Sequence, residues 1–216
     1  MANIKHDSTI NFMNISTKTP LREDAFDLDD DTKINLIEGH FREIMNIMGL
    51  DLTDDSLRDT PKRVAKMYVK EHFSGLNPAN KPRVALFENK YNYQQMVLEK
   101  DISFYSNCEH HFVPIIGKAH VGYISNGVVV GLSKINRIVE YYSKRPQVQE
   151  RMTIQIANEL MESLKTEDVA VVIEAKHLCV SSRGIKDDTS LTTTSALFGQ
   201  FLDMDTRSEF LRLIGK

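Results

Sequence analysis

Apolar residues recur at helical spacing in two long stretches of the chain. The first covers residues 34–48 and is followed by Gly49, a residue type that commonly ends helices. Its apolar stripe consists of Ile34, Ile37, Phe41, Ile44 and Met48. The second stretch covers residues 148–164, where Val148, Met152, Ile156, Leu160 and Leu164 share one face. Both stretches therefore predict amphipathic helices.

Three shorter helices are predicted mainly from the residues at their ends. Thr60, followed by proline, suits the N-cap of a helix that Gly75 closes. Another helix is expected to begin around Ser133, which would cap it, and to break near Pro146. The sequence Thr206-Arg207-Ser208-Glu209 has the form of a capping box and predicts a C-terminal helix.

Strand-like patterns fill much of the chain between these helices. Residues 126–127 are Asn-Gly, a pair that predicts a tight hairpin between the second and third strands. Alternation in the fourth strand places His177 and Cys179 at the end of an apolar face. The predicted strands cover residues 96–105, 112–124, 128–132, 169–180 and 191–201.

This order of elements predicts an α+β protein whose strands pair mostly antiparallel. Residues 1–31 lack helical periodicity and collect acidic residues, so we expect a flexible N-terminal arm. Pro78 and Pro82 mark a linker. We therefore divide the chain into the arm, an N-terminal helical region over 32–80 and a catalytic domain over 81–216.

Composition excludes several classes of function. The chain has 216 residues and a net charge of −3, which argues against a protein that coats nucleic acid through its phosphates. Its apolar runs are too short to span a bilayer, and the N-terminus lacks an export signal. We expect a cytoplasmic protein with no membrane role.

The stretch Cys108-Glu109-His110-His111 carries the densest chemistry in the sequence. The chain's two cysteines are compatible with a disulfide, but histidines beside both sulfurs favour a metal site. Cys108, His111 and Cys179 would form a three-ligand zinc site with a fourth position open for water. A structural site with His110 or His177 as fourth ligand is the alternative. The spare histidines favour catalysis, because imidazoles transfer protons near neutral pH.

An anionic substrate is indicated near the predicted helix at residue 133. Gly131 permits close approach, the helix N-terminus offers backbone N–H groups, and Lys134 and Arg137 add positive charge. Arg183 follows Cys179 closely. Each feature alone is more often an ordinary cap or surface charge. The zinc deaminase signature and the common phosphate-loop motif are both missing from the sequence.

Four segments resemble the GTP cyclohydrolase I family: DTPKRVAKMY (59–68), CEHHFVP (108–114), GLSKINRIVEYYSKRPQVQERMT (131–153) and HLCVSSRG (177–184). The resemblance implies the tunnelling fold (T-fold), in which antiparallel strands and paired helices of several subunits form an oligomeric barrel. It further implies a homodecamer with active sites between subunits. The implied reaction uses GTP and water, opens the imidazole ring at C8, releases formate and forms 7,8-dihydroneopterin triphosphate, the first step of tetrahydrofolate and pterin synthesis.

The resemblance also implies a role for individual residues. Cys108, His111 and Cys179 would bind Zn²⁺, while His110 and His177 transfer protons. Glu150, with Gln149, would contact the guanine edge. The triphosphate would be held by Lys66, Ser133, Lys134, Arg137 and Arg183, with help from Arg63. Two other functions stay open from the residues: a zinc-stapled oligomer that only binds nucleotide, and a hydrolase that opens GTP without forming a pterin. Glu109 has no predicted role.

Overall fold

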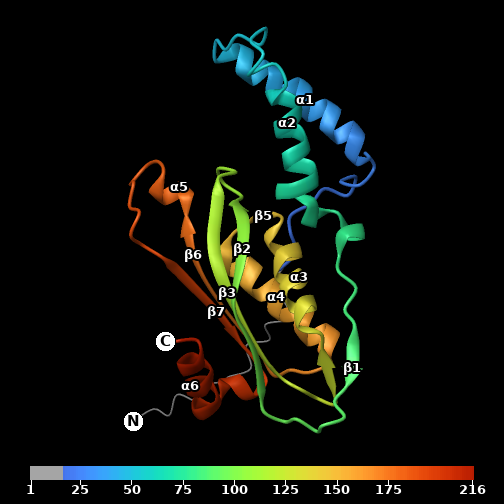
Figure 1. Cartoon of the computed structure of the whole chain (residues 1–216), viewed down its shortest axis with the longest axis vertical. Coiled ribbons are helices and arrows are strands. Elements are labelled where there is room, and N and C mark those ends of the chain that lie inside the picture. The colour runs from blue at the N-terminus through green and yellow to red at the C-terminus, as the bar shows by residue number, and fades with distance from the viewer. Residues whose placement is uncertain (1–16) are drawn as a thin grey trace, which may run out of the picture.

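A five-stranded sheet forms the centre of the protein, for which a computed structural model describes residues 17–216 (Figure 1). Its strand order is β5-β2-β3-β6-β7. The strands β2, β3, β6 and β7 pair antiparallel, and the short β5 adds parallel to the end of β2. The bounds are Met96–Cys108 (β2), Pro114–Ile124 (β3), Pro146–Gln147 (β5), Val169–His177 (β6) and Thr192–Leu197 (β7). The predicted α+β class with antiparallel pairing is confirmed.

Helices α3 (Leu132–Ser143) and α4 (Gln149–Leu164) lie side by side on one face of this sheet (Figure 1). Their apolar stripes, including Ile138 and Ile156, meet strand residues such as Val171 in the main hydrophobic core. The other face of the sheet is covered by α6 (Met204–Leu213) and by the short turn Gly199–Leu202. Phe201 and Phe210 are fully buried there against Val172. The strand β6 is therefore buried on both faces, which rigidly supports its end.

Three predicted helix caps and one hairpin are wrong, although α2 and α3 begin within one residue of the expected positions. The N-cap positions of α2, α3 and α6 are Asp59, Gly131 and Asp203, and none of them receives a side-chain capping bond. Thr60, Ser133 and Thr206 instead lie inside their helices. Across Asn126-Gly127, β4 (Val128–Val130) does not pair with β3. It pairs with β1 (Leu86–Glu88), and the Val130 N–H donates to the Tyr123 hydroxyl at 3.4 Å.

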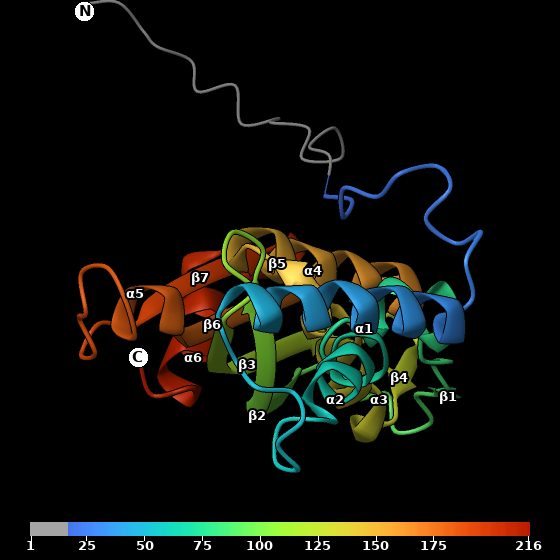
Figure 2. The same ribbon diagram turned by 90° about the horizontal axis from the view of Figure 1, so that it is seen from above.

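The N-terminal helices project from one end of the sheet (Figures 1 and 2). Helix α1 (Asp30–Ile47) begins where the Asp29 side chain accepts from the Thr32 N–H at 2.7 Å, and Gly49 follows its end with a φ of +78°. Within this chain, only part of the predicted stripe is covered, since Ile44 and Met48 are 48% and 69% exposed. Helix α2 (Thr60–Lys66) continues into the π-helical turn η2 (Met67–His72).

Gly75 does not cap that helix. It lies in a 3₁₀ turn (Ser74–Leu76) pressed against the end of α3, where its N–H donates to the Lys144 carbonyl at 2.8 Å. A second 3₁₀ turn, Pro78–Asn80, leads into the main body, and α5 covers Leu178–Ser181. Part of the predicted arm, residues 1–16, lies outside the described residues. Among the described helices, none is long and apolar enough to cross a bilayer.

Candidate metal centre and active site

Three predicted ligands converge at the end of the sheet that faces the N-terminal helices. Cys108 is the last residue of β2, His111 lies in the turn to β3, and Cys179 lies in α5. Their ligand atoms lie within 4.8 Å of one another. The strand β3 lies between β2 and β6 and brings their ends together, since its register sets Pro114 opposite Asn107 and Ile115 opposite His177. Cys179 lies two residues beyond the end of β6, in the first turn of α5, and not in the strand in which alternation had placed it.

The turn that carries His111 is held tightly. The Phe112 N–H donates to the Cys108 carbonyl at 2.8 Å, and the Cys108 N–H donates to the Val113 carbonyl at 2.9 Å. Phe112 adopts a left-handed φ of +53°. Its ring contacts Phe73 at a centroid distance of 5.0 Å and Tyr68 edge-on at 6.3 Å. The aromatic contacts thus connect the turn that carries His111 to the π-helical turn that follows α2.

The donor set fits a divalent metal that accepts sulfur and nitrogen. Burial, together with the nearby Cys108 thiol, raises the pKa of the Cys179 thiol. Two neighbouring thiolates in a partly buried site repel each other, and a bound cation removes that penalty. Among the described residues, no further His, Cys, Asp or Glu joins this cluster. The geometry therefore favours three protein ligands with one open position over a closed structural site.

Gln149 orients His177. Its amide nitrogen lies 2.9 Å from the Thr192 carbonyl and 3.1 Å from the Ile173 carbonyl, so the amide oxygen must face the histidine. That oxygen lies 2.7 Å from His177 Nε2. An amide oxygen only accepts, so Nε2 carries the ring proton and Nδ1 of the neutral imidazole is an acceptor. Burial lowers the pKa of His177, and the Glu150 carboxylate opposes the shift.

Gln149 is expected to contact the substrate, and in this structure its amide is turned toward protein groups. Its side chain is buried and its amide is fully occupied within the protein. Glu150, next in the chain, is exposed in the first turn of α4. The sequence contains no signal for the bond between Gln149 and His177, because only the sheet brings them together.

His110 lies beside the metal ligands but on their exposed side. Its Nδ1 is 3.7 Å from Cys108 Sγ, and its side chain is 65% exposed. A largely apolar cavity of 330 Å³ adjoins it, lined by Thr19, Pro20, Leu21, Leu76, Glu109, His110 and Pro146. The described part of the N-terminal arm therefore borders the site. Thr17 is held there because its carbonyl accepts from Gln155 Nε2 at 2.6 Å.

The predicted phosphate ligands do not all lie near the metal ligands. Arg183 does, since its guanidinium lies 3.0 Å from His111 Nε2. Ser133, Lys134 and Arg137 are in the first turns of α3, at the opposite end of the sheet. Asn136 there contacts Glu99 near the start of β2, and the 13 residues of that strand separate its ends by roughly 30–40 Å. Arg63 and Lys66 are exposed on α2.

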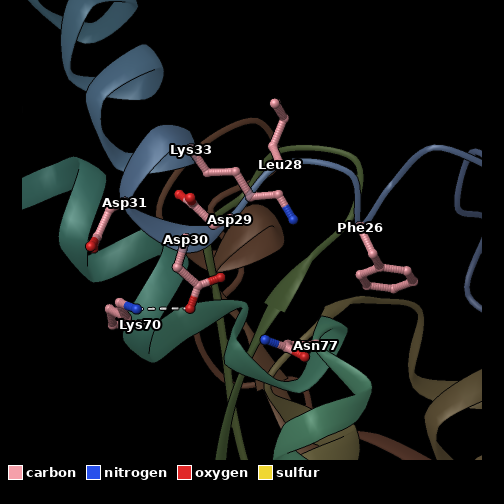
Figure 3. Close-up of a pocket in the computed structure, with 8 residues that line it drawn as sticks. All are labelled: Phe26, Leu28, Asp29, Asp30, Asp31, Lys33, Lys70 and Asn77. Atoms are coloured by element: carbon pink, nitrogen blue, oxygen red, sulfur yellow. Dashed lines mark hydrogen bonds and ion pairs between the residues drawn. The ribbon is translucent and has the colours of Figure 1, made fainter.

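A larger cavity of 470 Å³ lies away from this site, between the start of α1 and η2 (Figure 3). Its only ion pair joins Lys70 to Asp30 at 2.8 Å and ties the two helical elements together. The lining consists of Phe26, Leu28, Asp29, Asp30, Asp31, Lys33, Lys70 and Asn77. None of the predicted site residues lines it, so its size does not make it the candidate active site.

Comparison with known proteins identifies the family. The family model for GTP cyclohydrolase I matches residues 37–215. A protein named GTP cyclohydrolase 1 from Flavobacterium johnsoniae is 60% identical over 199 residues, which cover 92% of this chain and 89% of that protein. Its namesake from Enterobacter sp. (strain 638) is 54% identical over 198 residues, which cover 91% and 89%.

A structural match to the crystal structure of the archaeosine synthase QueF-Like in the apo form covers 49% of this chain and 94% of the chain in that structure. The TM-score of this match is 0.41 at 15% sequence identity. The family model spans both the helical region and the sheet, including every residue of the converged Cys-His-Cys cluster. This chain belongs to the GTP cyclohydrolase I family.

Proposed function

We propose that this protein converts GTP and water into formate and 7,8-dihydroneopterin triphosphate, the entry reaction of tetrahydrofolate and pterin synthesis. The observation that carries the proposal is the convergence of Cys108, His111 and Cys179 beside two histidines. Family membership supports it, since the relatives named above are GTP cyclohydrolases. Two free cysteines that act as metal ligands suit a reducing compartment, so we place the enzyme in the cytoplasm.

The metal that suits this site is Zn²⁺, held by Cys108, His111 and Cys179. A bound zinc ion would lower the pKa of a water molecule toward neutrality and so supply the nucleophile for C8. Two sulfurs and one imidazole nitrogen within 4.8 Å match the small tetrahedral shell that zinc prefers. These donors come from the end of β2, the turn to β3 and helix α5, which follows β6.

His177 and His110 would move the protons of the reaction. Opening the purine ring requires a proton for the departing nitrogen, and His177, whose ring Gln149 orients, would first accept a proton at Nδ1 and then deliver it to that nitrogen. His110 is on the exposed side of Cys108, where we place the ribose rearrangement. The exposed Glu150 carboxylate would accept hydrogen bonds from guanine N1–H and N2–H.

The triphosphate site requires more than one chain. Ser133, Lys134 and Arg137 lie at the opposite end of the sheet from Cys108, and no side chain bridges that span. We propose that they complete the active site of a neighbouring subunit, alongside Lys66, Arg63 and Arg183. Among residues 17–216 the edge strand β7 pairs with β6 alone, and we propose that its other edge takes part in such an assembly. A homodecamer is the assembly that we propose.

The direct test measures formate and oxidised-pterin fluorescence from GTP with the zinc-loaded protein. Both products are expected in equal amounts. Formate without pterin would identify a hydrolase that stops after ring opening. If neither product forms, the protein is instead a zinc-stapled oligomer that only binds nucleotide. Cys179→Ala should lose zinc and activity together, whereas His177→Ala should keep zinc and lose turnover. Zinc loss in the histidine variant would show that His177 is a ligand.

A further inference from the structure

We propose that Glu109 and Arg151 form a positioning pair that holds the His110 turn in register with the first turn of α4. This inference rests on the proposed function, because it assigns a task within the same active site. Sequence reasoning left Glu109 without a role, and Arg151 carried no prediction. The structure joins the two residues through a direct ion pair between Glu109 Oε2 and an Arg151 guanidinium nitrogen.

Glu109 is tied to its surroundings at both ends. Its backbone N–H donates to the Gln147 carbonyl at 3.0 Å. Its second carboxylate oxygen, Oε1, lies 3.9 Å from His110 Nε2. The side chain is 27% exposed and that of Arg151 is 14% exposed, so solvent screens the pair less than it would a surface pair. The carboxylate therefore lies between the Arg151 cation and the exposed His110 imidazole.

Arg151 is itself held from the other side. Its Nε donates to Gln147 Oε1 at 3.2 Å, and a terminal nitrogen donates to the Pro146 carbonyl at 3.3 Å. Gln147 is completely buried and donates through Nε2 to Gln155 Oε1 at 2.8 Å. Because two groups of β5, the Gln147 amide oxygen and the Pro146 carbonyl, hold the planar guanidinium independently of Glu109, its position is set by β5 and α4. Glu109 is the partner that is positioned.

As a consequence, the first turn of α4 positions both proton-transfer histidines. One turn of α4 carries Gln149, which orients His177, and Arg151, which holds the residue before His110. Glu150, the proposed guanine ligand, lies between them in the chain. The distance between the two imidazoles is therefore set by a single rigid element. Catalytic groups need such support, because small displacements reduce turnover strongly.

The test uses Glu109→Gln and Arg151→Met, separately and together. Each is expected to lower kcat by about 10–100-fold, with zinc content unchanged and KM for GTP within about twofold. The double variant should lose no more than the worse single variant, because both changes break one pair. Glu38→Gln is the matched control, since it breaks a 3.0 Å Arg42–Glu38 pair on α1 and should leave kcat unchanged.

Three results would overturn the proposal: unchanged kcat in Glu109→Gln, loss of zinc together with activity, or losses that add in the double variant. A rise in KM alone would mean that Glu109 contacts substrate directly. A crystal structure of zinc-loaded Glu109→Gln gives a reading that does not depend on GTP turnover. His110 should leave its position there, and an unmoved His110 contradicts the proposal. Failure of the proposed function would show separately, as a wild-type protein that releases no formate.

Discussion

Replacing Gln149 by methionine tests the geometry of the site most directly. Methionine keeps the length and apolar stem of glutamine but removes the amide that bonds His177. If Gln149 orients the histidine, kcat falls while KM for GTP stays the same. If instead it contacts guanine, KM rises. The same substitution thus separates the role seen in the structure from the one expected on family resemblance.

The magnitude follows from the bonds that are lost. Thr194 Oγ1 keeps a partner in Thr153 Oγ1 at 2.7 Å, but the His177 N–H has no other hydrogen bond among the described residues. A buried polar group left unpaired costs about 1–3 kcal/mol, so we expect that loss in the free energy of unfolding. General acid–base catalysis contributes about 10²–10⁴-fold. A misoriented ring should forfeit part of this, about 10–100-fold in kcat.

The assay combines three measurements on the same preparation: formate release, zinc content and thermal melting at fixed protein concentration. Glu159→Met is the control, because Glu159 is also a buried, hydrogen-bonded residue of α4, but its partners, the Tyr142 hydroxyl and Lys81, are not part of the proposed site. It should lower the melting temperature and leave kcat largely intact. The proposed role of Gln149 is refuted if the Gln149→Met variant has a lowered melting temperature but turns over GTP at the wild-type rate. It is also refuted if the variant loses zinc.

Three further outcomes are expected. Lys134→Ala should weaken GTP binding more than guanosine binding, and equal GTP affinities by calorimetry would contradict the phosphate assignment. Gly75→Ala should cost at least about 1–3 kcal/mol of stability in denaturant unfolding, because its Cβ would lie 2.8 Å from the Lys144 carbonyl oxygen. Burial lowers the pKa of His120 below 6.5, so the unfolded chain binds the extra proton first and stability falls as pH drops below that value. His120→Gln should flatten this fall in urea unfolding between about pH 5 and 7.5; an unchanged slope would refute the assignment.

Long periodic patterns predicted their elements well. The stripes over 34–48 and 148–164 became α1 and α4, and the apolar alternation of residues 169–177 became the buried strand β6. Such patterns succeed because many positions repeat the same periodicity and so support one another, even in α1, where Ile44 and Met48 stay exposed within this chain. Short local signals failed more often. The Asn126-Gly127 pair allowed a hairpin, but the neighbouring strand β1, distant in sequence, supplied the partner for β4.

The sequence by itself determined the candidate ligands, although it placed Cys179 in a strand and the structure places it in α5. Cys108, His111 and Cys179 are the right donors for zinc, and residue chemistry is local to each position. Only the tertiary structure decided what surrounds them: Gln149 faces His177, and Arg151 faces Glu109. Residues so far apart meet through the register of β3 and the docking of α4 on the sheet. No spacing along the chain encodes such contacts, because they depend on how separate elements pack.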